Sequence, residues 1–375
     1  MNSEHTSPLG VVVVGYGYWG PNIVRNVIER PELELLALCE MDSTKAERFS
    51  SRYPEIPVIP SFDDVLADPR VDAVSIATPP RTHHPLVKAA LEAGKHVLVE
   101  KPLATTVAHA EELVELAERN NLVLMPGHTF LYSPPVNKIH QLIREGDLGE
   151  IYFVTSARLN LGLYQSDGVV CDLAPHDLSI LLYWLDRTVE TVTATGCTVF
   201  QDGVPETAFL TLCFDDDTKA NIQVSWLSPR KVRQMVVVGS KRMVQYDDTA
   251  ADDPVRVYDR GLDWAEPSNL GEYRLTYRSG DMVAPRIDGA EPLSLELEDF
   301  ARAITTGARP RSHAQLGLEI VRVLEAARES LEADGRPVAI NRTPVLALAS
   351  GSEPGKRFAR LPRAIPTEQP ETEAA

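Results

Sequence analysis

Cysteine is scarce in this chain, and its placement excludes several kinds of site. The four cysteines among 375 residues are Cys39, Cys171, Cys197 and Cys213. They form no CxxC pair and no Cys/His ligand spacing, so neither a zinc site nor a disulfide framework is indicated. We therefore expect reduced thiols in a cytoplasmic protein, with no bound metal.

Positive charge is also low. The chain carries 37 Lys and Arg against 54 Asp and Glu, which gives a formal net charge of -17. A nucleic-acid-binding surface would be basic, so we expect no nucleic-acid partner. The small basic clusters, such as Arg230 and Lys231 with Arg233, are interpreted as solvated surface.

Long apolar runs are missing as well. No run is long enough to span a bilayer, and residues 1–9 lack the basic and apolar segments of a secretory signal. Hydrophobic residues make up 43% of the chain and charged residues 24%, as in ordinary globular proteins. We expect no membrane partner, and a length sufficient for two domains.

A glycine-rich turn is the first feature that points to a function. A valine-rich run from Leu9 to Val14 predicts a buried parallel strand, and residues 21–28 predict a helix. Between them lies Gly15-Tyr16-Gly17-Tyr18-Trp19-Gly20. Such glycines allow the backbone amides at a helix N-terminus to approach a pyrophosphate. Strand, turn and helix together predict dinucleotide binding.

An acidic residue follows at the distance that this motif requires. The next predicted strand, from Leu33 to Cys39, ends at Glu40, 20 residues after Gly20. An acid at this place binds the adenine ribose hydroxyls. Because Glu40 would repel a 2′-phosphate, NAD is favoured over NADP, although Lys45 and Arg48 lie nearby in the sequence.

Strands and helices continue to alternate as far as Gly127. Strands are expected at residues 58–59, 71–77, 96–100 and 122–125, and helices at 63–66, 84–93 and 107–120. This alternation predicts a doubly wound parallel sheet. Ligands bind beyond the carboxyl ends of such strands. The strand ends expected to line one crevice are Gly15, Glu40, Thr78-Pro79, Glu100-Lys101 and Gly127-His128.

Lys101 is the residue on which the rest of the prediction depends. It follows the apolar strand that ends at Glu100, so it is placed to contact a ligand, and Pro102 fixes how the chain leaves. His83 also follows a strand end. It is expected either to contact the ligand or to be a solvated histidine at the start of a helix.

From residue 128 the pattern changes to that of a second domain. Helices are expected at residues 134–146, 295–304 and 316–333, and strands at 149–160, 191–200, 206–214, 219–226 and 233–239, with further strands at 256–258 and 273–277. Consecutive strands with short turns predict a large, mainly antiparallel sheet. We divide the chain into 1–127, 128–340 and a flexible or draped tail at 341–375.

Asp172 and His176 lie four residues apart on a predicted helix. Pro175 suits a first helical turn, so the helix is expected to begin near Asp172. The spacing puts the carboxylate and the imidazole on one face, where the carboxylate would orient the ring and raise its pKa. On these residues alone, a helix-capping Asp172 and a core or surface histidine is an open alternative.

These motifs together resemble the Gfo/Idh/MocA oxidoreductases. The similarity runs from about Leu9 to about Ile340 and is carried by the glycine turn, Ala77-Thr78-Pro79 with His83, residues 93–97, and Glu100-Lys101-Pro102. It implies an N-terminal Rossmann-type domain with bound NAD(P) and a C-terminal α+β domain. It also implies that Asp172 and His176 face the nicotinamide beside Lys101, and that the protein is a homodimer or homotetramer.

Two further stretches resemble the branch of the family that acts on nucleotide sugars. They are the stretch from Arg158 to Gln165 together with Asp172 to His176, and residues 127–130 with His128. That branch works at C3 of a hexose. Arg158 and Tyr164 are equally open to a structural role. The alternatives are a free sugar or inositol dehydrogenase, and an NAD-binding regulator without turnover.

The predicted site is therefore as follows. The catalytic residues are Lys101, Asp172 and His176. The cofactor-binding residues are Gly15, Tyr16, Gly17, Tyr18, Trp19, Gly20, Glu40, Thr78, Pro79, His83, Glu100 and Lys101. The substrate-binding residues are Lys101, His128, Arg158, Tyr164, Asp172 and His176.

Overall fold

The valine-rich stretch forms the central strand of a six-stranded parallel sheet in the computed structural model, which describes residues 7–162, 168–200, 203–265, 274–287 and 289–342. The strand order is β3-β2-β1-β4-β5-β6. The strands are β1 (Leu9–Val14), β2 (Leu33–Cys39), β3 (Val58–Ile59), β4 (Ala73–Ile76), β5 (His96–Glu100) and β6 (Leu124–Gly127). The order reverses beside β1, so a ligand crevice is expected at the ends of β1 and β4.

Helices connect these strands because the sheet is parallel and each crossover must return to the same edge. They are α1 (Gly20–Glu29), α2 (Ser43–Arg52), α3 (Phe62–Ala67), α4 (His83–Glu92) and α5 (Val107–Arg119), with a short 3-10 turn η1 (Pro80–Thr82) before α4. β1 is buried along almost its whole length, as expected for a strand covered on both faces.

The second sheet has nine strands in the order β14-β13-β12-β11-β7-β10-β9-β8-β15. Its described pairs are antiparallel except β7 with β10, which are parallel. The strands are β7 (Ile151–Leu161), β8 (Val189–Cys197), β9 (Thr207–Phe214), β10 (Lys219–Ser225), β11 (Leu227–Gly239), β12 (Met243–Asp247), β13 (Val255–Ala265), β14 (Arg274–Val283) and β15 (Val338–Ala339).

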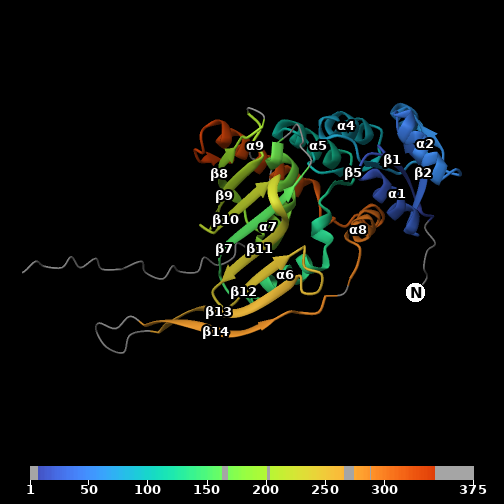
Figure 1. The fold of residues 1–375 in the computed structure, drawn as a ribbon. Helices are drawn as coiled ribbons and strands as arrows, with labels where there is room; N and C mark the ends of the chain where they lie inside the picture. The colour runs from blue at the N-terminus through green and yellow to red at the C-terminus, as the bar shows by residue number, and fades with distance from the viewer. Residues whose placement is uncertain (1–6, 163–167, 201–202, 266–273, 288, 343–375) are drawn as a thin grey trace, which may run out of the picture. The chain divides into compact units, whose positions relative to one another are not determined.

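Helices cover one face of the nine-stranded sheet (Figure 1). Along the sequence, η2 (Thr129–Tyr132) comes between the strands of the two sheets. The helices that follow it are α6 (Pro134–Arg144), α7 (Gly168–Leu185), α8 (Pro292–Thr306) and α9 (Ala314–Glu332). Alternate residues of β9 and β10 are buried against these helices, for example Leu210, Leu212, Ile222 and Val224. This alternation is typical of an antiparallel sheet with one face on the core.

The last two helices return to the first sheet. Leu297 and Phe300 of α8 pack in one core with Val11 and Val13 of β1, and α8 lies beside α1 (Figure 1). α9 contributes Val321 to the core on the other side of the parallel sheet. Residues up to 340 form one compact unit, so the boundary at 127 separates the two sheets but not their cores and stays a prediction.

The predicted fold class is confirmed: a parallel Rossmann-type sheet is followed by a large, mainly antiparallel sheet. The irregular region after residue 249 holds a longer hairpin than expected, β13 with β14. Of the predicted tail, 343–375 lies outside the described residues. Within the described part of the chain, no helix is long and apolar enough to cross a membrane.

The start of α7 was predicted wrongly. The helix begins at Gly168, four residues before Asp172, and Pro175 lies inside it rather than in its first turn. Val169 and Val170 are buried, and this packing extends the helix toward its N-terminus despite the proline. Because Pro175 has no N–H, it cannot donate the usual hydrogen bond one turn back. The Cys171 carbonyl, four residues earlier, therefore receives no hydrogen bond from residue 175.

Phe300 gives a direct test of the packing between α8 and the first sheet. Its side chain is 0% exposed, so Phe300→Ala should lower the free energy of unfolding by about 3–5 kcal/mol, measured by urea denaturation. Phe200→Ala makes the same change at a side chain that is 78% exposed and should have little effect. Equal losses in the two variants would contradict this packing.

Candidate functional site

A cleft of about 1270 Å³ lies where the strand ends of the first sheet meet α7 and the nine-stranded sheet. Most of the predicted site residues line it. They are Gly15, Tyr16, Gly17, Tyr18, Trp19, Glu40, Thr78, Pro79, Glu100, Lys101, Asp172 and His176. Residues from both halves of the sequence therefore meet in one cavity.

The glycine turn has the shape that a dinucleotide requires. Gly15 has a φ of +95°, and a Cβ there would lie 2.9 Å from the Ala77 carbonyl oxygen. A Cβ on Gly20 would lie 2.4 Å from the Gly15 carbonyl oxygen, so both positions need glycine to pack the turn. A Cβ on Gly17 would meet nothing within 4 Å, which leaves room for a ligand to approach the backbone.

The start of α1 and the end of β2 complete this end of the cleft. Trp19, the N-cap residue of α1, makes no side-chain cap hydrogen bond, so the first amides of the helix suit an anion such as a pyrophosphate. The Glu40 carboxylate accepts hydrogen bonds from the backbone N–H groups of Tyr16 (2.8 Å) and Asp42 (3.0 Å). These residues fit a dinucleotide with free ribose hydroxyls.

Lys101 joins the two halves of the cleft. Its ammonium group donates a hydrogen bond to the Asp172 backbone carbonyl at 2.7 Å and lies 3.4 Å from the Asp172 carboxylate. That carbonyl lies in the turn of α7 that precedes Pro175. α7 thus supplies both acceptors that hold the lysine at the cleft.

The expected contact between Asp172 and His176 is wrong. The Asp172 carboxylate faces Lys101 and accepts a hydrogen bond from the Trp226 indole N–H at 3.1 Å. Trp226 lines the cleft at the end of β10. The four-residue spacing placed the two side chains on one helix, but the carboxylate turns to the lysine and the indole.

The predicted rise in the pKa of His176 is also wrong. Burial lowers the pKa of His176 well below 6.5, and the positive charges of Lys101, Arg158 and Arg233 lower it further. The ring packs edge-on against Phe130, with ring centroids 5.2 Å apart. His176 is therefore neutral at pH 7 and can accept a proton.

Two arginines lie opposite each other on β7 and β11, close to His176. Arg158 pairs with Arg233 in the sheet register, and both guanidinium groups lie over the Phe130 ring, at 4.6 and 5.9 Å from its centroid. Arg158 is buried and bonded to Asp177 at 2.8 Å. Only the second guanidinium of this pair lines the cleft.

Arg233 was wrongly assigned to solvated surface. It forms an ion pair with Asp248 at 2.9 Å and lines the cleft. The sequence held a signal for this position, because Met235 and Val237 are buried and lie at even spacing from it on the same strand. An apolar alternation that continues into a charged residue indicates a cation turned toward the core.

Several predicted residues lie outside the lining of the cleft. Gly20 supports the turn from beneath, and Arg158 is engaged by Asp177. His83 is buried and bonds two backbone carbonyls, so the solvated interpretation is wrong. Tyr164 lies outside the described residues.

His128 is buried directly after β6. Neither of its ring nitrogens has a hydrogen-bond partner among the described residues, and burial lowers its pKa to about 3. Glu100, which lines the cleft, has its pKa raised to about 7 by burial, against the lowering effect of Lys101. Lys101 is thus flanked by a neutral imidazole and by a carboxyl that is part protonated near neutral pH.

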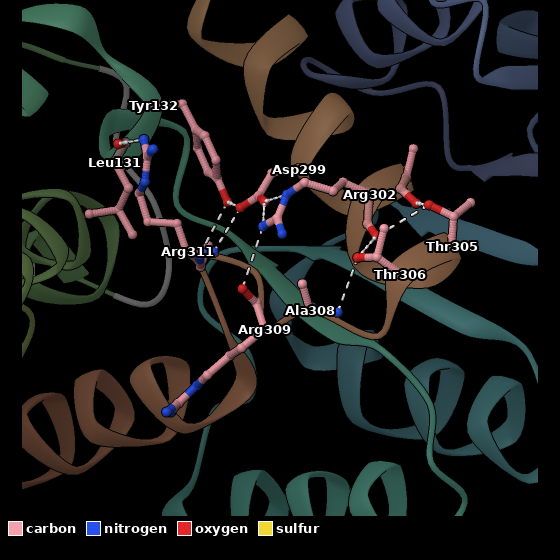
Figure 2. A network of polar contacts seen from close by, with 11 residues as sticks. Leu131, Tyr132, Asp299, Arg302, Thr305, Thr306, Ala308, Arg309 and Arg311 are labelled. Atoms are coloured by element: carbon pink, nitrogen blue, oxygen red, sulfur yellow. Dashed lines mark hydrogen bonds and ion pairs between the residues drawn. The ribbon is translucent and has the colours of Figure 1, made fainter. Parts of the chain in front are cut away.

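A polar network holds the segment after His128 in place. Figure 2 shows the Tyr132 hydroxyl bonded to Asp299 of α8, while Arg311 donates to the Leu131 carbonyl. Arg302 pairs with the same carboxyl group of Asp299 (Figure 2). The α8–α9 loop is thereby bound to η2, the segment that follows His128.

Two family models match the chain. Residues 9–128 match GFO_IDH_MocA, an oxidoreductase family with an NAD-binding Rossmann fold. Residues 136–245 match the GFO/IDH/MocA C-terminal domain. Between them the two matches cover the glycine turn, Lys101, Asp172 and His176.

Known proteins resemble the chain over much of its length. It is 31% identical to the UDP-N-acetylglucosamine 3-dehydrogenase of Acidithiobacillus ferrooxidans over 248 residues, 65% of this chain and 73% of that one. It is 30% identical to the inositol 2-dehydrogenase of Rhodococcus jostii over 192 residues, about half of each. The crystal structure of GenD2 from gentamicin A biosynthesis, in complex with NAD, has a TM-score of 0.75 at 25% identity and covers 91% of this chain and 99% of its own.

The charge state of His176 can be tested in the protein alone. Nitrogen-15 NMR, with His176→Asn to identify the signal, should show a neutral ring at pH 6.5 that is protonated only at lower pH, since burial and nearby cations oppose its charge. Arg233→Gln removes one of these charges and should raise the pKa of His176. The exposed Arg260→Gln is the control. A ring still protonated at pH 6.5 would contradict the site described above.

Proposed function

The chain belongs to the GFO/IDH/MocA oxidoreductase family, and we propose that it transfers a hydride between NAD and C3 of a nucleotide-linked hexose. The observation that carries this proposal is the meeting of Lys101, Asp172 and His176 in the same cleft as the glycine turn and Glu40. When bound, NAD supplies the nicotinamide ring that accepts or donates the hydride.

His176 is the proton acceptor in this proposal. Its ring is neutral at pH 7 because burial and the cations around it lower its pKa. A neutral imidazole can take the hydroxyl proton as the alcohol is oxidised, and the imidazolium can return it during reduction. The same cations oppose the charged ring, which favours prompt release of the proton.

Lys101 donates to the reacting oxygen. Its ammonium is held by the Asp172 carbonyl and carboxylate, which leaves one further N–H donor on the same group. A donor aimed at the oxygen stabilises the negative charge that develops there during the reaction. Asp172, fixed in turn by Trp226, acts here by orienting the lysine.

NAD is the proposed cofactor rather than NADP. Two backbone N–H groups fix the Glu40 carboxylate at the end of β2, where it would repel a 2′-phosphate. Lys45 lines the cleft, but it lies 3.9 Å from Asp42, a partner for its charge. Arg48 lies over the Tyr16 ring at 5.9 Å.

A nucleotide-linked sugar is the proposed substrate because of its charge. Arg233 and Trp226 line the cleft on the side of the nine-stranded sheet and offer a cation and an aromatic surface. A diphosphate would pair with the Arg233 guanidinium, and a sugar ring or base would pack on the Trp226 indole. A relative that matches over 73% of its length is named for action at C3 of such a substrate.

A homodimer or homotetramer is proposed through the face of the nine-stranded sheet that the helices leave open. Phe209 of β9 is exposed between buried Ala208 and Leu210, and Phe153 of β7 is exposed next to exposed Tyr152. Exposed aromatic side chains on a broad sheet are typical of an interface between protein subunits.

Two variants test the catalytic assignment. Lys101→Ala removes the donor to the oxygen and His176→Ala removes the proton acceptor, so each should lower kcat by roughly 100-fold or more. NAD affinity, measured by calorimetry, should stay within a few-fold of that of the unaltered protein. His140→Ala is a matched control. His140 lies on α6, and its ring stacks on Tyr183.

Near-normal kcat in both Lys101→Ala and His176→Ala would contradict the catalytic roles proposed for these two residues. Loss of NAD binding in both would show a cofactor-binding role instead of the proposed catalytic one.

A further inference from the structure

His83 lies between the two loops that bring the cofactor and the lysine together. It is the first residue of α4, and its side chain is 0% exposed. Its Nε2 atom lies 2.9 Å from the Thr78 carbonyl oxygen, and its Nδ1 atom lies 2.8 Å from the Pro102 carbonyl oxygen. The ring therefore spans from the end of β4 to the end of β5.

These two loops serve different parts of the cleft. Thr78 and Pro79 line it directly after β4, beside the glycine turn. Pro102 follows Lys101 directly after β5. β4 and β5 are neighbours in the parallel sheet, with Ile76 opposite Val99, but beyond the strands the sheet no longer holds the two chains together. The His83 ring takes over that connection at the point where the site begins.

The ring cannot serve both carbonyls in its neutral form. Both partners are backbone oxygens, which only accept hydrogen bonds, and a neutral imidazole has a single N–H donor. The imidazolium has two and bonds both loops at once. Burial and the charge of Lys101 lower the pKa of His83, while the two carbonyls act in the opposite direction. Lys101 is the one charged group that acts on the ring among the described residues.

We propose that His83 is a positioning residue that couples the cofactor loop at Thr78 to the loop of Lys101. As a neutral ring it holds one loop at a time, and as a cation it holds both. A cofactor that contacts the loop at Thr78 and Pro79 changes the demand of that carbonyl for the shared proton. The hold on Pro102, and with it the position of Lys101, changes in response. The inference rests on the proposed function only in treating Lys101 as the catalytic lysine.

His84 is a matched control within the same helix. Its Nε2 atom lies 2.8 Å from the Glu112 carboxylate of α5, and its ring stacks on His109 at 3.9 Å. It therefore bonds a side chain on a neighbouring helix. The His83 and His84 rings are equal in size and adjacent in sequence. A general loss of packing in α4 would follow from either substitution, whereas loss of coupling would follow only from the first.

The first experiment compares His83→Gln with His84→Gln. The glutamine amide can still donate to one carbonyl but cannot take a charge. We expect His83→Gln to weaken NAD binding about tenfold by calorimetry, because the amide cannot move its donor from one carbonyl to the other when NAD binds, and to lower kcat at saturating NAD at least as much. His84→Gln should leave both within twofold. Unchanged kcat and NAD affinity in His83→Gln, or equal losses in both variants, would overturn the proposal.

A spectroscopic measurement tests the coupling without turnover. In nitrogen-15 NMR, with His83→Gln to identify the signal, we expect both His83 ring nitrogens to be protonated at low pH and one at pH 8. Adding NAD should change which ring nitrogen is protonated, or the fraction of rings in which that nitrogen is protonated. A His83 signal that NAD leaves unaltered would overturn the coupling.

A second NMR measurement, on the Lys101 side chain, separates this proposal from the function on which it rests. In NAD-free protein, His83→Gln should shift the carbon-13 signal of the Lys101 side chain, and His84→Gln should not. If no substrate is turned over, the proposed function fails while these NMR arms still decide the coupling. If Lys101→Ala abolishes turnover but His83→Gln leaves the carbon-13 signal of Lys101 unchanged, the proposed function stands and the proposed coupling fails.

Discussion

The contact between the Lys101 ammonium and the Asp172 backbone carbonyl is the interaction on which the site depends. It joins a loop of the parallel sheet to a helix of the second half of the chain. Trp226 fixes the Asp172 carboxylate from a third element, β10. Three elements that are distant in sequence therefore determine where one amine points.

Burial and the surrounding cations determine the protonation state of the His176 imidazole. Arg158 and Arg233 lie side by side on neighbouring strands, and each is paired with its own carboxylate, so the sheet tolerates them. Burial first, and then the charges of Lys101 and these two arginines, lower the pKa of His176, so its ring is neutral near pH 7. The cleft thus holds both a donor, Lys101, and a proton acceptor, His176, as hydride transfer to or from an alcohol requires.

The sequence predicts the parts of the site that local patterns determine. The glycine turn, Glu40 and Lys101 follow strand ends, and strand ends can be located from short apolar runs. Sequence reasoning placed Asp172 beside Lys101 through the family resemblance but gave its carboxylate the wrong partner, because helical spacing gives a shared face and not the group that a carboxylate contacts on another element. Arg233 was missed because it was grouped with the nearby charged pair Arg230 and Lys231, although its two-residue spacing from buried Met235 held the signal.

The most direct test of the proposed chemistry follows NADH absorbance with a panel of nucleotide sugars, free sugars and inositols. The account predicts NAD reduction with a nucleotide-linked hexose that carries a free 3-hydroxyl, and none with its 3-deoxy analogue. Faster reduction with a free sugar or an inositol would contradict the proposed substrate class. Tight NAD binding without turnover of any compound would contradict the enzyme assignment itself.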